Sequence, residues 1–464
     1  MVYIYLAYLI SIMNINSIKI LLPEIMVDLS VSINWLTWVV NSYTLPLAAL
    51  IPVAGKIGDL YGPRKFFLAG IFILGAGSLI CGTAFSLGWL ISGRVIQAVG
   101  AALLVPNSLA ILMAKTEESE RGKVLGLWSG IGASGAVIGP VLSGLLADFV
   151  SWRGAFIFLS LLAMLITALA VKKMNVGMEQ GKRLKKRKVN FDGPGAVTLM
   201  SSTAILLLAI TVLPDWGWDD TRVKAAAAAV IVLFYLFYRF EKKAADPLIN
   251  PLLLKNPRFS LGLLAGFIEQ VGISGTLFVL PIYFGTALGY GPARTALLLL
   301  PAATVVSLLS PLGGKLSDRF GQGKPIIVGM ALRAFSFYMF SRIAMDTSYL
   351  YIALGLALNG LGFAMTATPA LHSVLSTVDS TRNGVASGVH NMVRFTGSAA
   401  GTTIAGIILY ALIPSVFEGV TGPLPGFREA FLFGAAACLP GIGAGVYLAL
   451  LNNRHKVMEE EITG

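Results

Sequence analysis

The sequence predicts an all-α protein that crosses a lipid bilayer many times. Of its 464 residues, 56% are hydrophobic and 12% are charged, and the mean hydropathy is +0.78, which is far more apolar than a soluble domain. Apolar segments of about 20 residues, each sufficient for one helical crossing, recur along the whole chain. The strict alternation of membrane β-strands is absent from the sequence, so the spans are expected to be helices.

About fourteen apolar segments are candidate spans. In chain order they cover residues 2–22, 34–54, 66–83, 86–112, 123–147, 154–171, 195–213, 222–239, 259–284, 294–313, 325–343, 349–374, 389–412 and 428–451. The first segment continues past "LLPEI" without a small-residue cleavage pattern, so we expect it to be a span rather than a removable signal peptide.

The net charge of +12 raises the question of a nucleic-acid partner, and the placement of the basic residues argues against one. With an even number of spans both termini lie on one side, and that side carries about 25 of the 35 Lys and Arg residues, against about 6 on the other face. This bias predicts a multi-pass plasma membrane protein with both termini cytoplasmic. The run "GKRLKKRK" at residues 181–188 is expected to anchor the topology at an anionic leaflet.

Residue types that carry enzyme or metal chemistry are scarce. Cys81 and Cys438 lie in apolar spans and are predicted to be small core residues without a disulfide. His372 and His390 lie at helix ends and His455 in the tail, as ordinary polar residues. We find no nucleophile constellation, metal-ligand spacing or phosphate loop in the sequence, so we expect neither an enzyme nor a cofactor.

A charged, glycine-rich stretch occurs twice. "GKIGDLYGPRK" at 55–65 and "GKLSDRFGQGK" at 314–324 share Gly, Lys, Asp, Gly and Lys at the same offsets, and each follows an apolar segment on the predicted cytoplasmic side. The chain is therefore interpreted as an internal duplication, which is typical of transporters whose halves rock about a central site. The glycines permit sharp turns, and Asp59 or Asp318 can accept from a helix N-terminus or a neighbouring Arg, which would latch the cytoplasmic gate.

Both copies resemble the loop motif of the major facilitator superfamily. The matching positions are Gly55, Asp59, Gly62, Arg64 and Lys65 in the first copy and Gly314, Asp318, Arg319 and Gly321 in the second.

Further motifs agree with that resemblance. "RVIQAVGAA" resembles the fourth-helix motif through Arg94, Gln97 and Gly100, and "SWRGAF" at 151–156 and "NGVASGVHNMVRFTG" at 383–397 are similar to the fourteen-helix drug:proton antiporter branch. The segment "GAVIGPVLSG" resembles the fifth-helix antiporter motif, whose positions are filled by Gly135, Gly139, Pro140 and Gly144.

The resemblance implies a major facilitator fold of two six-helix bundles plus two inserted helices. We expect an N-terminal bundle over 1–175, a basic cytoplasmic linker over 176–194, an inserted pair over 195–240, and a C-terminal bundle with a short tail over 241–464. The two inserted spans hold no interior acid, and we assign them no direct role in coupling.

The resemblance also implies proton-coupled efflux of amphipathic small molecules by alternating access. In the resembled family the fifth-helix motif marks exporters that run against protons, and it would bend its helix and allow close packing. Arg94, about eight residues into its span, must find a carbonyl, carboxylate or water, and the resemblance implies a part in proton coupling. An ordinary kinked helix and a structural partner for Arg94 are the alternatives.

The first span departs from the branch pattern. In "MNINSIKILLP", Asn14 stands at the acidic position and Lys19 at an asparagine position. An ammonium facing the cavity would favour an anionic or zwitterionic substrate over a cationic one. The alternative is that Lys19 snorkels to the periplasmic interface, which lies about 6 Å of helical rise away at Pro23.

Glu269 is the remaining deep acid, about ten residues into its span. A carboxyl group at this depth could load and release a proton as the cavity alternates between sides. The alternative is a permanently neutral carboxyl or a structural pair with Lys19, Arg333 or Arg394. The residues expected to line the substrate cavity are Asn14, Lys19, Asn41, Gln97, Glu269, Gln270, Asn359 and Arg394.

Two other functions remain open at this point. One is a proton symporter or uniporter for an anionic or zwitterionic solute, since a fold does not set direction. The other is a membrane sensor that has lost transport. The expected partners are an amphipathic small molecule, protons and the lipid bilayer, with no nucleic acid, and we expect a monomer.

Overall fold

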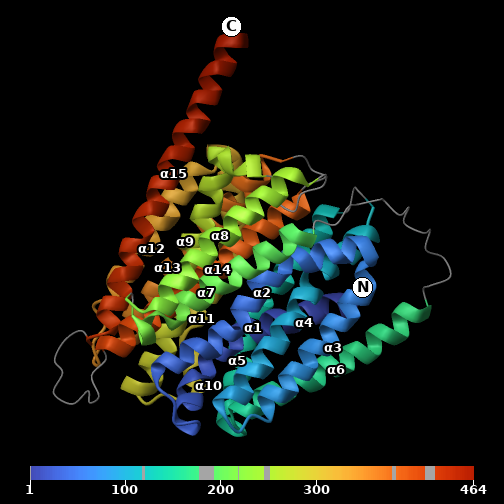
Figure 1. Ribbon diagram of the computed structural model, residues 1–464. Coiled ribbons are helices and arrows are strands. Elements are labelled where there is room, and N and C mark those ends of the chain that lie inside the picture. The colour runs from blue at the N-terminus through green and yellow to red at the C-terminus, as the bar shows by residue number, and fades with distance from the viewer. Residues whose placement is uncertain are drawn as a thin grey trace. The chain divides into compact units, whose positions relative to one another are not determined.

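The computed structural model describes the backbone of residues 2–117, 121–176, 193–217, 219–244, 251–378, 383–412 and 424–463. Within these ranges every regular element is a helix, and the helices follow one another through short turns (Figure 1). The predicted all-α class is confirmed for this part of the chain. The predicted basic linker at 176–194 lies almost wholly outside the described residues.

The chain divides into two compact units. Unit 1 comprises Met1–Leu248 and Tyr290–Leu297, and unit 2 comprises Ile249–Gly289 and Leu298–Gly464. Unit 1 holds α1 (Val2–Asp28), α2 (Ile33–Tyr61), α3 (Pro63–Gly82), α4 (Leu87–Ala114), α5 (Arg121–Phe149), α6 (Trp152–Val176), α7 (Gly193–Trp216), α8 (Thr221–Lys243) and most of α10 (Pro292–Leu298). Unit 2 holds α9 (Pro257–Ile282), α11 (Leu300–Phe320), α12 (Gly323–Phe340), α13 (Tyr349–Leu375), α14 (Asn383–Leu412), α15 (Phe427–Thr463) and the short turns η2 (Pro251–Lys255) and η3 (Tyr283–Ala287).

Side-chain caps fix several helix starts. The carboxylate of Asp220 accepts from the backbone N–H of Arg222 at 2.7 Å, and Asn256 Oδ1 accepts from the N–H of Arg258 at 3.0 Å. Each cap satisfies one N–H that has no partner within its own helix. Asp220 lies outside the membrane spans, and the hydrogen bond from the Arg222 backbone N–H lowers the pKa of its carboxyl below the usual range.

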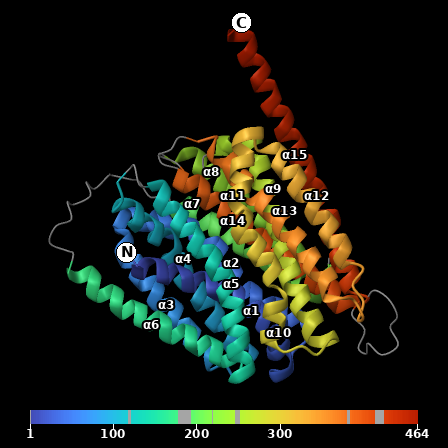
Figure 2. The same cartoon turned by 180° about the vertical axis from the view of Figure 1, so that it is seen from behind.

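The two units repeat one packing order. In unit 1, α1 packs on α5, α2 packs on α4, and α3 packs on α4 and α6. In unit 2, α9 packs on α14, α11 packs on α13, and α12 packs on α13 and α15. Figure 2 shows α3 beside α6 and α12 beside α15, the equivalent pairs. The same pairing of successive helices agrees with an internal duplication, which the repeated loop motif indicated.

The helices α7 and α8 stand outside this repeated order. They pack on each other, and α7 also packs on α2. Only 17% of the most apolar 18-residue stretch of α8 is buried inside the protein. The helix extends to Lys243 and so includes Glu241, a buried acid that the predicted span 222–239 leaves out.

The number of spans differs from the prediction. Every one of the fourteen predicted ranges overlaps a helix. In the described part of the chain, however, only twelve helices are long and apolar enough to cross a membrane. The twelve do not include α7 or α12. Within its 18 residues α12 carries Lys324 and Arg333, which lower its apolarity, and several side chains of α7 lie outside the described part. The prediction of fourteen spans is not confirmed.

Candidate functional site

Arg94 on α4 lies at the centre of a buried polar network in unit 1. The residue is 1% exposed. Its Nη1 donates to Asn14 Oδ1 at 3.1 Å and to Gln97 Oε1 at 2.9 Å, and its Nε donates to the Val39 carbonyl at 3.3 Å. The guanidinium also lies 4.4 Å from the ring centroid of Tyr43. The sequence predicted that Arg94 needs a carbonyl, carboxylate or water as a partner. Its partners are the Val39 carbonyl and the side-chain amide oxygens of Asn14 and Gln97.

Ser78 of α3 completes this network. Its Oγ accepts from Asn14 Nδ2 at 3.1 Å and from Gln97 Nε2 at 2.8 Å, and donates to the Leu74 carbonyl at 2.8 Å. All of these acceptors are neutral, so the guanidinium is stabilised by dipoles and by the Tyr43 ring. Sequence reasoning found Asn14, Gln97 and Arg94 but missed Ser78, because one serine in an apolar helix carries no distinguishing pattern.

Two further predicted cavity residues, Lys19 and Asn41, are also buried in unit 1. Lys19 is 6% exposed and Asn41 is 0% exposed. Burial alone does not show that either side chain faces a substrate cavity, so the cavity role of both residues stays a prediction.

The glycines of the fifth-helix motif bring α5 against α1. A β-carbon added at Gly139 would lie 2.8 Å from the Cα of Met13, and one at Gly135 would lie 3.0 Å from the Leu9 carbonyl oxygen. At Gly144 the added atom would lie 2.7 Å from the Pro292 carbonyl oxygen at the start of α10. These distances leave no room for a side chain, so close packing at the motif is observed. The effect of the motif on proton leak stays a prediction.

The first copy of the loop motif turns tightly and holds α2 against α4. Gly62 between α2 and α3 has a φ of 97°, which favours glycine. A β-carbon at Gly58 would collide with the side chain of Asn107, whose Nδ2 donates to the Ala54 carbonyl at 3.3 Å. Among the other predicted gate residues, Gly55 packs near Pro106, Arg64 is half-buried and Lys65 is exposed. The side chain of Asp59 lies outside the described residues.

The second copy makes the equivalent contact between α11 and α13. Gly321 has a φ of 76°, and Gly314 lies against Thr368 of α13. Ser317 Oγ lies 3.1 Å from His372 Nδ1, and Asp318 Oδ1 lies 3.8 Å from the same nitrogen. Asp318 therefore lies beside His372, which can form an ion pair with it when the imidazole is protonated, rather than beside an Arg. Arg319 is exposed, with its guanidinium 5.1 Å from the ring centroid of Phe320.

Glu269 on α9 is the buried acid of unit 2. The residue is 0% exposed, and its Oε1 forms an ion pair with Arg394 Nη2 of α14 at 3.3 Å. The same Nη2 donates to Gln270 Oε1 at 3.2 Å. In the described part of the chain Glu269 Oε2 has no hydrogen-bond partner. Of the cations considered from the sequence, Arg394 is the one that pairs with this carboxyl, and Lys19 belongs to unit 1.

Asn359 on α13, another predicted cavity residue, is 0% exposed. Neither atom of its amide has a hydrogen-bond partner among the described residues. Glu269 Oε2 and the Asn359 amide are thus buried polar groups of unit 2 without a hydrogen-bond partner in the described part of the chain, whereas such groups are expected to be rare.

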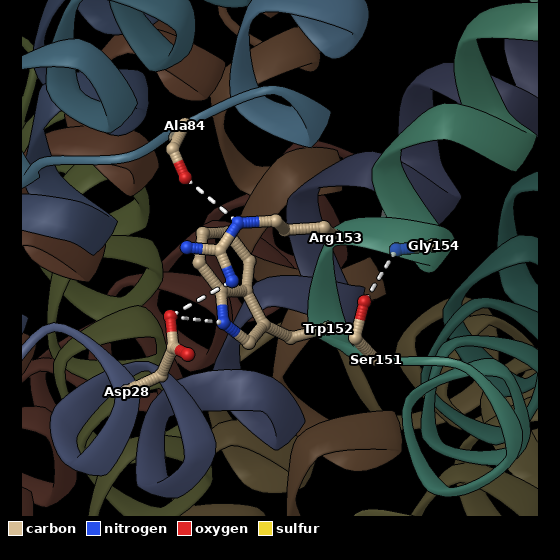
Figure 3. Close-up of polar contacts among 6 residues, drawn as sticks. All are labelled: Asp28, Ala84, Ser151, Trp152, Arg153 and Gly154. Carbon is tan, nitrogen blue, oxygen red and sulfur yellow. Dashed lines mark hydrogen bonds and ion pairs between the residues drawn. The ribbon is translucent and has the colours of Figure 1, made fainter.

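The segment "SWRGAF" ties three helices of unit 1 together. Arg153 Nη1 forms an ion pair with Asp28 Oδ2 at 2.8 Å, and Arg153 Nε donates to the Ala84 carbonyl at 2.7 Å. Trp152 Nε1 donates to Asp28 Oδ2 at 3.2 Å, and Ser151 Oγ accepts from the Gly154 N–H at 3.4 Å (Figure 3). The contacts join the end of α1, the turn after α3 and the start of α6, which gives this motif a structural role.

Comparison with protein families gives a match over most of the chain. Residues 4–402 match the model of the Major Facilitator Superfamily. This range includes both copies of the loop motif, the Arg94 network and the Glu269 site.

Known relatives are similar to the chain over most of their length. A "Tetracenomycin C resistance and export protein" of Streptomyces glaucescens is 28% identical over 93% of this chain and 80% of the relative. A "Methylenomycin A resistance protein" of Bacillus subtilis is 28% identical over 96% of this chain and 93% of the relative. "Multidrug resistance protein Stp" of Mycobacterium tuberculosis is 29% identical over 86% and 74%. These relatives are named as drug export or resistance proteins.

Proposed function

The chain belongs to the Major Facilitator Superfamily, and on that premise we propose that it is a proton-coupled antiporter that exports amphipathic small molecules by alternating access. In this proposal the two duplicated bundles rock about a central substrate site. The proposal includes membership of the fourteen-helix branch, with α7 and α8 as an inserted pair that takes no part in coupling. It works as a monomer in the plasma membrane with both termini in the cytoplasm.

One observation carries the proposal of proton coupling. Glu269 is fully buried, its Oε1 is held by Arg394 at 3.3 Å, and its Oε2 has no hydrogen-bond partner within the described ranges. Protonation of the carboxyl weakens the ion pair and releases guanidinium donors, while loss of the proton restores the pair. A single proton thus changes which contacts hold α9 to α14.

The sign of coupling follows from the charge that the substrate brings to this site. A cationic group near Glu269 favours the ionised carboxyl and expels its proton, so proton and substrate exclude each other, as antiport requires. An anionic group has the opposite effect and makes proton and substrate bind together. Antiport through Glu269 therefore predicts proton release when substrate binds.

The remaining roles are assigned around that exchange. Arg94 tunes or relays the proton, Asn14 and Lys19 contribute to the N-terminal side of the cavity, and Asp59 with Arg64 latches the cytoplasmic gate. The names of the relatives, which mention tetracenomycin C, methylenomycin A and multidrug resistance, support a drug-like substrate class.

The test measures protons released when candidate substrates are added to purified protein in weakly buffered detergent. A lipophilic cation and an anionic amphiphile are compared on wild type, Glu269→Gln and Glu241→Gln. The last variant is a matched control, because Glu241 is a buried acid 2% exposed on α8. We expect the cation to release protons from wild type and Glu241→Gln but not from Glu269→Gln.

Two outcomes would replace the proposal. Proton uptake on binding the anionic amphiphile would identify a symporter for anions, as Lys19 in the first span would favour. Substrate binding without proton exchange in wild type would identify a uniporter or a transport-dead sensor, and flux into proteoliposomes would separate these two.

A further inference from the structure

Arg333 on α12 is a fully buried cation, and it has no hydrogen-bond partner among the described residues. The residue is 0% exposed, and none of its three guanidinium nitrogens has a partner in the part of the chain that the structure describes. Phe337 lies on the same helix with its ring centroid 5.8 Å from the guanidinium carbon. Because an unpaired buried charge is strongly destabilising, this side chain needs a physical reason to be retained.

Two glycines on neighbouring helices make room for Arg333. A β-carbon added at Gly272 of α9 would lie 2.5 Å from Arg333 Nη2, and one added at Gly362 of α13 would collide with the Arg333 side chain. An alanine at either position would require the arginine to move. The helices around α12 are therefore shaped to accept the side chain at this position.

The same face of α9 places Glu269 between two arginines. Gly272 follows Glu269 by three residues, and Gly266 precedes it by three, so all three lie on one face with about 4.5 Å of rise per step. A β-carbon at Gly266 would lie 3.4 Å from Arg394 Cγ. Arg394 thus lies beside α9 one turn before Glu269, and Arg333 lies beside it one turn after Glu269.

The other polar groups of this region complete the surroundings of the carboxyl. His390 on α14 lies against Gly266, and Cys438 is a buried thiol on α15, which packs on α12 and α9. Asn359 lies on the face of α13 that carries Gly355 and Gly362. Gly355 lies against Phe340 of α12, and Gly362 lies against Arg333 of the same helix. The charged groups that face Glu269 from α12 and α14 are therefore Arg333 and Arg394, with His390 as a further titratable group and Cys438 behind Arg333.

We propose that Arg333 is a positioning residue of the proton site, which stabilises ionised Glu269 through Oε2 from the side opposite Arg394. When the proton leaves Oε2 for water, that oxygen becomes an acceptor for the unused donors of Arg333, and when the proton returns the contact is lost. The carboxylate is thereby held between helices α12 and α14 in its ionised form only. This inference rests on the proposed role of Glu269 and adds a second cation to it.

The first experiment measures the pH profile of substrate-evoked proton exchange in wild type, Arg333→Gln and Arg333→Lys. Removal of a nearby cation makes the ionised carboxylate less favourable, so the midpoint for Arg333→Gln should move to higher pH by roughly one unit. Arg333→Lys keeps the charge and should restore most of the wild-type profile. Arg342→Gln, at an exposed arginine just after the same helix, is the control and should leave the profile in place. A folded Arg333→Gln variant with the wild-type midpoint would overturn the inference.

A second experiment does not depend on transport. A double-mutant cycle compares the melting temperatures of Glu269→Gln, Arg333→Gln and the double variant. If the two groups interact, the double variant should melt above the temperature that the two single shifts predict together, because neither change then leaves an uncompensated partner. Pairing Arg333→Gln with Glu241→Gln is the control and should be additive.

The two experiments separate the inference from the proposed function. Absence of proton exchange in wild type would reject the coupling role of Glu269, and the cycle would then decide Arg333 alone. Additive shifts for the Glu269 and Arg333 pair would reject the interaction even where proton exchange is normal. If Arg333→Gln does not fold, recovery of folding in the double variant supports the interaction and failure of both rejects it.

Discussion

In unit 1 the buried guanidinium of Arg94 donates to Asn14, Gln97 and the Val39 carbonyl, whereas in unit 2 Arg333 is equally buried and has no hydrogen-bond partner in the described chain. Unit 2 also holds Glu269, one of whose oxygens has no hydrogen-bond partner within the ranges that the structure describes. The helices around the two sites pack in the same order. The two units therefore share a packing order, while the polar groups in their interiors differ.

The difference is informative because buried polar groups normally satisfy one another. The Arg94 network pairs the cation with neutral groups and thereby joins α1, α2, α3 and α4. At the Glu269 site, Glu269 Oε2 and the Arg333 guanidinium have no hydrogen-bond partner among the described residues, which suits a site whose contacts change during a transport cycle. In the proposed cycle Glu269 of unit 2 therefore carries the proton, and Arg94 of unit 1, which is held by neutral groups, tunes or relays it.

The largest expected effect comes from removing the cation of the complete network. Arg94→Leu would leave the oxygens of Asn14 and Gln97 and the Val39 carbonyl buried without their donor, at a cost of roughly 2–4 kcal/mol of folding free energy. Arg94→Lys keeps the charge but loses the fork geometry and should be intermediate. Melting temperature and yield after detergent extraction measure the effect. If Arg94→Leu were as stable as wild type, the contrast between the two arginine sites would be wrong.

Glycine pairs show how far the two units share one packing device. Gly139 of α5 lies against Met13 of α1, and Gly401 of α14 lies against Val271 of α9, where an added β-carbon would be 2.8 Å from the Val271 Cα. Substituting alanine at either position should cost roughly 1–3 kcal/mol, because backbone must move. Thermal unfolding of Gly139→Ala and Gly401→Ala measures this.

Each helix offers its own control for the glycine prediction. A β-carbon at Gly130 of α5 or at Gly388 of α14 meets nothing within 4 Å. Alanine there should be neutral or stabilising by up to about 1 kcal/mol, since glycine weakens a helix. A similar loss at all four positions would show that backbone flexibility, and not close packing, is what these glycines provide.

A smaller effect is expected when the missing acid of unit 1 is restored. Asn14 Oδ1 accepts from Arg94 Nη1 at 3.1 Å, so Asn14→Asp would convert that hydrogen bond into an ion pair. If the Arg94 network exchanges protons, an acid at position 14 should increase the protons released per bound lipophilic cation, as measured in weak buffer, and Asn14→Ser is the neutral control. An unchanged proton count would mean that the Arg94 network does not exchange protons.

Much of the scaffold could be predicted from the sequence, because apolar segment length and the repeated loop motif depend on local pattern. Each predicted span overlaps a helix. The sequence also indicates Arg94, Asn14 and Gln97 as candidate site residues, and their side chains are joined by hydrogen bonds. The sequence offered Lys19, Arg333 and Arg394 as possible partners of Glu269, but the choice of Arg394 could not be predicted, because it depends on which faces of α9, α12 and α14 meet. The glycines at 401 and 272 were missed for the same reason.

The smallest expected effect concerns the contact between Asp28 and Arg153. The two side chains are 43% and 30% exposed, and partly exposed ion pairs contribute about 1 kcal/mol or less because solvent and salt screen them. Asp28→Asn keeps an acceptor for Trp152 Nε1 and removes only the charge, so the melting temperature should fall slightly and lose part of its dependence on salt. Trp152→Phe removes the buried indole donor and should destabilise more. If Asp28→Asn were the more damaging change, the contact would depend on charge rather than on packing, and this end of unit 1 would resemble the charged site of unit 2.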